Sequence, residues 1–144
     1  MLFRKPARRE PRMTTLRPRS IEVPGVTHGT VPIPMGARVG DVLYSSGIAG
    51  IDPATGKLAD GAAAQARLAF QNLRTLLANG GATLEDVVRL TVYVKDNGAR
   101  EPVNAEWLQC FPDPHDRPAR HTLVYDLQHG MLLQLDAVAV VQPL

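Results

Sequence analysis

Residues 63–96, AAQARLAFQNLRTLLANGGATLEDVVRLTVYVKD, change their hydrophobic period halfway along. In the first half, apolar side chains recur at steps of three and four, at Ala66, Ala69, Phe70, Leu73, Leu76 and Leu77. This spacing predicts a helix with one apolar face, and Gly80-Gly81 is a typical left-handed stop. In the second half, Val88, Leu90, Val92 and Val94 alternate with polar residues or tyrosine, which predicts a strand with one buried face.

Similar patterns lie on both sides of this block. Before it, residues 37–47 (ARVGDVLYSSG) form two short extended segments around Gly40-Asp41, and residues 50–57 (GIDPATGK) are a loop. After it, residues 101–111 (EPVNAEWLQCF) are a second helix, with strands at residues 121–126 and 131–141. The predicted order is ββαβαββ, an α+β fold with two helices on one face of a mixed sheet.

The last predicted strand has two apolar faces. One face holds Leu133, Leu135, Ala137 and Ala139, and the other holds Gln134, Asp136, Val138 and Val140. Two helices are enough to cover one sheet face. We therefore expect another subunit to cover the second face.

Charge divides the 144-residue chain into two parts. Residues 1–20 carry a net charge of +6, and the remaining residues carry −4. We expect residues 1–20 to be a disordered tail and residues 21–144 to be one domain, with two alternatives for the tail: an arm that contacts an anionic partner, or a translation start at Met13. The acidic domain is a poor match for a phosphate backbone, so nucleic acid is an unfavoured partner.

Composition excludes several other classes. No apolar run reaches 18 residues, and the tail lacks the apolar core of a secretory signal. The single cysteine, Cys110, cannot form an intrachain disulfide, which favours a reducing, cytoplasmic location. The histidines and Cys110 have no zinc-type spacing, so we predict no metal site.

Several consecutive blocks resemble one known family. Residues 117–127 (RPARHTLVYDL), followed by residues 133–141 (LQLDAVAVV), are similar to the Rid family of imine and enamine deaminases, the RidA/YjgF type first labelled endoribonuclease L-PSP. Residues 43–47 (LYSSG), 52–58 (DPATGKL) and 103–107 (VNAEW) extend the resemblance over residues 32–141.

The resemblance implies a fold, an assembly and a reaction. The fold is chorismate-mutase-like, and the assembly is a homotrimer with its sheets packed inward and its active clefts between subunits. The reaction is hydrolysis of reactive 2-imino or enamine acids to 2-keto acids and ammonia, without metal or organic cofactor.

The resemblance also implies two catalytic residues. Arg120 matches the family arginine, and a planar guanidinium can grip the substrate carboxylate through two hydrogen bonds. Asp136 stands where the family has a glutamate. Its carboxylate would polarise the attacking water, on a side chain that is one methylene shorter. We expect its apolar neighbours to raise the pKa of its carboxyl, and the alternative is a structural acid bonded to backbone amides.

Four further positions are candidate substrate-binding residues. Ser46 and Gly47 match a loop that bonds substrate through its backbone, and Thr122 replaces a family cysteine that contributes backbone contacts. Ile33 stands where relatives have a tyrosine over the cleft. His121 should face away from Arg120, because side chains alternate along a strand.

Three other functions compete with general imine hydrolysis. One is a pathway-specific deaminase of the same fold, and another is a non-catalytic module that binds small carboxylates. The third is RNA cleavage, which the older family label suggests. The acidic domain argues against it, and so does the lack of two histidines at a suitable spacing.

Overall fold

The computed structural model describes residues 18–143, and most of the predicted tail lies outside them. Its elements are β1 (Ser20–Ile21), β2 (Gly36–Val39), β3 (Val42–Ser45), β4 (Ile51–Asp52), β5 (Lys57–Leu58), α1 (Ala62–Asn79), β6 (Val87–Val94), α2 (Arg100–Cys110), β7 (Ala119–Val124) and β8 (Leu133–Val140). The predicted ββαβαββ order is confirmed, and β1 and the β4–β5 hairpin are additions to it. Within the described part of the chain, no helix is long and apolar enough to cross a membrane.

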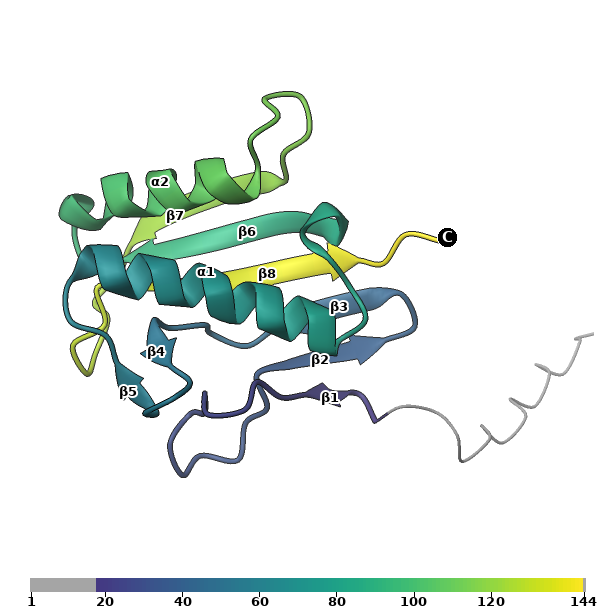
Figure 1. The fold of residues 1–144 in the computed structure, drawn as a ribbon, viewed down its shortest axis with the longest axis horizontal. Helices are drawn as coiled ribbons and strands as arrows, with labels where there is room; N and C mark the ends of the chain where they lie inside the picture. Colours follow the sequence, from purple (N-terminus) through teal and green to yellow (C-terminus); the bar gives the residue numbers. More distant parts are fainter. Residues whose placement is uncertain (1–17, 144) are drawn as a thin grey trace, which may run out of the picture.

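Six strands form one mixed sheet in the order β1-β2-β3-β8-β6-β7. Among the strands of residues 18–143, β6 and β7 alone pair in parallel, and α2 makes the crossover that a parallel pair requires. Both helices lie in front of the sheet in Figure 1, with α1 across β8 and α2 beside β7. The strand β7 is therefore an edge strand, flanked by α2 on one face only.

The core lies between the sheet face that the helices cover and the apolar stripe of α1. Leu73 and Leu76 of α1 are fully buried, as are Leu90 and Val92 of β6 and Leu135 of β8. The helix ends as predicted, and the left-handed residue is Gly81, with φ +77°.

The prediction for Val88 was wrong, because this side chain is 50% exposed. A register shift between Val87 and Arg89 interrupts the pairing of β6 with β8. The extra residue turns Val87 inward, where it is 6% exposed, and turns Val88 out. Leu90, Val92 and Val94 then point inward as predicted, and Thr91 between them is 7% exposed as well.

The sheet face opposite the helices carries exposed apolar side chains that no segment of residues 18–143 covers. It carries side chains that are 36–57% exposed, namely Val39, Val42, Tyr44, Leu123 and Val140. We call this the open face. It is the face on which a second subunit was expected.

Candidate functional site

Arg120 lies on β7 with its side chain turned toward α2. Its guanidinium carbon is 5.2 Å from the centroid of the Trp107 ring, a cation–π contact. Its Nε–H donates to the Thr122 hydroxyl oxygen at 2.9 Å. Within residues 18–143, no carboxylate lies within salt-bridge distance of Arg120. The planar guanidinium of Arg120 is thus held in place without a neutralising anion from residues 18–143.

The surroundings of Arg120 disfavour its positive charge. Burial, and then repulsion from Arg100, lower the pKa of the Arg120 guanidinium from its usual value. Arginine nonetheless stays protonated at neutral pH. A partly desolvated cation without an ion-pair partner is a favourable place for a small anion.

Asp136 lies on the other face of the sheet. Arg120 pairs with Leu90 of β6, whereas Asp136 pairs with Thr91. Leu90 and Thr91 are consecutive, so they and their partners point to opposite faces. His121 also pairs with Thr91, which confirms that it faces away from Arg120. One chain therefore does not bring Arg120 and Asp136 together.

The environment of Asp136 agrees with the sequence-based expectation. Burial raises the pKa of its carboxyl, and the charge of Arg89 opposes that rise. A carboxyl with a raised pKa exchanges protons more readily near neutral pH.

Ser46 and Gly47 follow β3. They differ in whether the backbone amide already has a hydrogen-bond partner. The Ser46 amide donates to the Met35 carbonyl at 2.8 Å, and its hydroxyl donates to the Pro34 carbonyl at 2.7 Å. The Gly47 carbonyl accepts from His28 Nε2 at 3.1 Å, whereas the Gly47 amide has no partner among residues 18–143. The candidate backbone donor in this loop is therefore Gly47.

Two polar residues of α1 hold neighbouring loops, and the sequence analysis missed both: Asn72 holds the segment after Gly47, and Gln65 holds Ala59 and the turn before β8. Asn72 Nδ2 donates to the carbonyls of Ala49 and Ile51 at 3.1 and 2.8 Å. Gln65 Nε2 donates to the Ala59 and Gly130 carbonyls, and its Oε1 accepts from the Leu132 amide. Both residues are 2% exposed or less. The available signal was their position, an i, i+7 pair beside the apolar stripe.

A cavity of about 480 Å³ opens beside this loop, and Ile33 and Gly47 line it. Most of its other walls are apolar, with Thr27, His28, His129 and Gln134 as polar members. Gly47 lies so close to Gln134 that an added Cβ would be 2.4 Å from its side chain. Gln134 and Asp136 are two residues apart on β8 and share the open face.

The predicted site residues thus occupy three places in one chain. Arg120 and Thr122 lie on the helix side of β7, Asp136 lies on the open face, and Ile33 and Gly47 line the cavity, with Ser46 supporting the loop. Within residues 18–143, no three His, Cys, Asp or Glu side chains form a group that could hold a metal ion.

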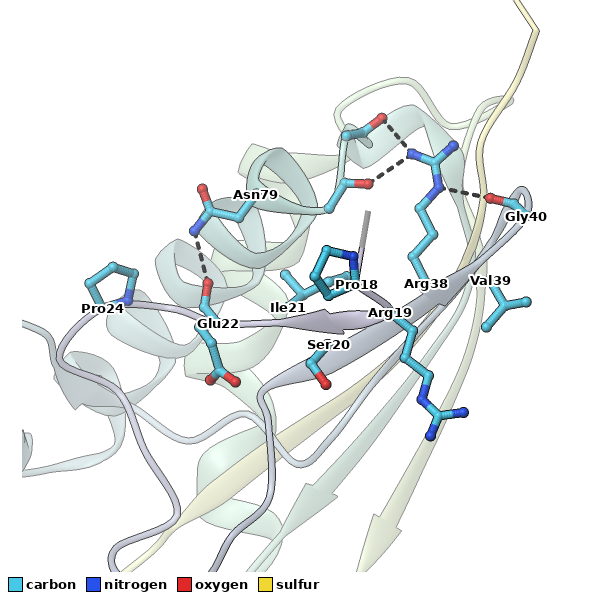
Figure 2. A pocket seen from close by; sticks show the side chains of 12 residues that line it. Pro18, Arg19, Ser20, Ile21, Glu22, Pro24, Arg38, Val39, Gly40 and Asn79 are labelled. Carbon is cyan, nitrogen blue, oxygen red and sulfur yellow. Dashed lines mark hydrogen bonds between the residues drawn. The ribbon is translucent and has the colours of Figure 1, made fainter. Parts of the chain in front are cut away.

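A larger groove, of about 990 Å³, lies elsewhere, between β1, β2 and the end of α1. Arg38 donates to the carbonyls of Gly40, Gly80 and Gly81 there, while Arg19 extends away from it (Figure 2). The two guanidiniums do not converge on one point, and the groove contains none of the predicted site residues.

Comparison with known proteins gives concordant matches. A family model described as Endoribonuclease L-PSP matches residues 33–141. The chain is 32% identical to a 2-iminobutanoate/2-iminopropanoate deaminase of Salmonella typhimurium, over 76% of this chain and 87% of that protein. It is 31% identical to a RutC family protein of Aquifex aeolicus, over 85% and 98% of the two chains.

Solved structures agree with these matches. A putative endoribonuclease from Thermotoga maritima superimposes with a TM-score of 0.79 at 29% identity, covering 87% of this chain and 98% of that one. The YjgF protein of Escherichia coli gives 0.76 at 27% identity, covering 85% and 98%.

Proposed function

This chain belongs to the endoribonuclease L-PSP family, the RidA/YjgF group, and from that premise we propose that it hydrolyses reactive 2-imino acids to 2-keto acids and ammonia. The observation that carries the proposal is Arg120. Its guanidinium is oriented by Trp107 and Thr122 and has no carboxylate partner within residues 18–143. Such a fork suits a planar carboxylate, the group that every 2-imino acid carries next to the reacting carbon.

The positions of the two reactive residues call for more than one chain. Arg120 and Asp136 lie on opposite faces of the sheet, so a small substrate cannot touch both in one subunit. We infer a homotrimer in which the open faces pack inward and each site lies between two subunits. One subunit supplies Arg120 and Thr122, and its neighbour supplies Asp136, Gly47 and Ile33. The exposed apolar side chains of the open face support this assembly.

The chemistry needs one water and no redox step. Water adds to C2 of the protonated C=NH2+ bond, and its proton passes to the Asp136 carboxylate. The resulting tetrahedral carbon carries a hydroxyl and an amino group. Asp136 returns the proton to nitrogen, the C–N bond breaks, and the departing ammonia takes the hydroxyl proton as C=O forms, so ammonium leaves. Arg120 fixes the carboxylate, so that C2 meets the water in a reactive orientation.

RNA cleavage is not favoured by the site. His28 and His129 do line one cavity, although they are far apart in sequence, so sequence spacing was a weak reason for excluding such a pair. However, His28 Nε2 donates to the Gly47 carbonyl and its Nδ1 is buried, so neither ring nitrogen of His28 is free to contact an RNA strand.

The test is an imine-trapping assay. An amino-acid oxidase with catalase generates the imine, semicarbazide captures it, and added protein competes by hydrolysing it. We expect semicarbazone formation to fall in proportion to protein concentration while total keto acid is maintained. Keto acids should also bind in calorimetry. Binding without any loss of semicarbazone would identify a non-catalytic carboxylate-binding module instead.

A further inference from the structure

The cavity beside Gly47 is built from apolar side chains of several segments. Val26, Val31, Ile33 and Met35 come from the segment before β2, and Ala49, Ile51, Leu58 and Met131 complete the walls. Its volume is about 480 Å³. Pockets of this size and character bind apolar groups much larger than a methyl or an ethyl.

Its chemistry also excludes charge. Among the described residues that line it there is no Asp, Glu, Lys or Arg. His28 Nε2 donates to the Gly47 carbonyl, and its Nδ1 is buried without a hydrogen-bond partner among residues 18–143. A charged substrate side chain would lose its hydration here without gaining an ion pair.

We propose that this cavity is the side-chain pocket of the site, and that it selects 2-imino acids with large apolar side chains over the three- and four-carbon acids. The inference rests on the proposed hydrolysis. Gly47 lines the cavity and its amide has no partner among residues 18–143, so a substrate that accepts a hydrogen bond from this amide would have its side chain among apolar walls that include Val31, Ile33 and Leu58. Each methylene taken out of water adds roughly fourfold to affinity, so leucine-sized side chains gain most.

One oxidase can supply the whole substrate series. D-Amino acid oxidase acting on D-alanine, D-2-aminobutyrate, D-leucine and D-phenylalanine yields imines that have no stereocentre at C2, so they equal those of the L series. With catalase and semicarbazide present, we expect kcat/KM for the leucine- or phenylalanine-derived imine to exceed that for the alanine-derived imine at least about tenfold. Equal values, or a preference for the alanine-derived imine, would overturn the inference.

A pocket-narrowing variant tests the location. Val31 is 54% exposed and lines the cavity, so Val31→Trp should fold and reduce the space. We expect the leucine-to-alanine ratio of kcat/KM to fall at least fivefold. The matched control, Leu108→Trp, alters a side chain that is 54% exposed on α2, outside the cavity, and should keep the ratio of the parent protein. An unchanged ratio in Val31→Trp would place the side-chain pocket elsewhere.

Calorimetry separates this inference from the reaction itself. We expect 4-methyl-2-oxopentanoate to bind at least tenfold more tightly than pyruvate, and Val31→Trp to remove that difference. This binding pattern without imine hydrolysis would contradict the proposed reaction and support the pocket. Hydrolysis with tighter pyruvate binding, or no binding of either acid, would overturn the pocket.

Discussion

At the scale of single residues, the central feature is an arginine whose side chain is oriented and which has no ion-pair partner among residues 18–143. Arg120 is positioned by an aromatic ring and a hydroxyl, and its charge is disfavoured by burial and by Arg100. A surface charge would be solvated or paired instead. This arrangement is a reason to test the guanidinium as a carboxylate anchor.

Arg120→Lys should fail as an anchor almost as fully as Arg120→Ala. An ammonium cannot form the two parallel hydrogen bonds of the fork, and a charged hydrogen bond is worth about 1.5–3 kcal/mol. We expect keto-acid affinity, measured by calorimetry, to fall at least about tenfold in both variants. Arg117→Lys is the control. Arg117 donates to the Phe111 carbonyl, so we expect this variant to bind the keto acid as tightly as the parent protein does. Normal binding by Arg120→Ala would refute the anchor.

Asp136→Asn should raise stability at neutral pH while lowering turnover. Burial raises the folded-state pKa of Asp136 above the unfolded value, so its ionised form destabilises the fold. That cost is present above the folded pKa and disappears as pH falls below the unfolded pKa of about 3.9. Thermal melts should show a higher Tm for the variant at pH 7 and convergence with the parent protein in acid.

Asp126→Asn provides a control of opposite sign. Lys95 donates to Asp126 at 2.6 Å and lowers the pKa of that carboxyl. Its small stabilising effect is present at neutral pH and lost in acid, so this variant should melt slightly lower at pH 7. If Asp136→Asn also melted lower at pH 7, Asp136 would be a structural acid that accepts stabilising hydrogen bonds.

At the scale of elements, α1 both builds the core and fixes the loop beside the cavity. Asn72 connects the helix to the carbonyls of Ala49 and Ile51. Asn72→Ala leaves both acceptors without this donor, which should cost about 1–3 kcal/mol in urea unfolding. Hydrogen exchange should also become faster around residues 47–51. Gln71→Ala, one position earlier on an exposed face, should change neither.

Sequence patterns predicted the helices and most strands. Particular residues show which features these patterns could not predict. Period-two alternation placed Leu90, Val92 and Val94 correctly and missed Val88, because a bulge depends on the pairing partner. The apolar stripe identified the face of α1, yet Gln65 and Asn72 also donate to the carbonyls of Gly130 and Ala49, which are distant in sequence. The resemblance selected Arg120 and Asp136, while only the strand register showed that they face opposite sides of the sheet.

At the scale of the whole molecule, the open face is the surface that residues 18–143 leave uncovered. We expect light scattering to give three times the 15.6 kDa chain mass at micromolar concentration. Val42→Glu places a charge on the open face, where Val42 is 40% exposed, and should lower the mass toward that of the monomer. Leu108→Glu alters the outer side of α2 and should remain trimeric. A monomer mass for the parent protein would contradict the assembly.

The composite site is the central claim, and complementation between subunits tests it most directly. Arg120→Ala and Asp136→Asn are each expected to be nearly inactive alone. If each site takes Arg120 from one subunit and Asp136 from its neighbour, trimers assembled from an equal mixture regain about one quarter of the sites intact. The account predicts that imine hydrolysis by co-expressed variants returns to roughly that fraction of the parent rate. Mixed trimers no more active than the separate variants would show that both residues serve one site from the same chain, and would contradict the account.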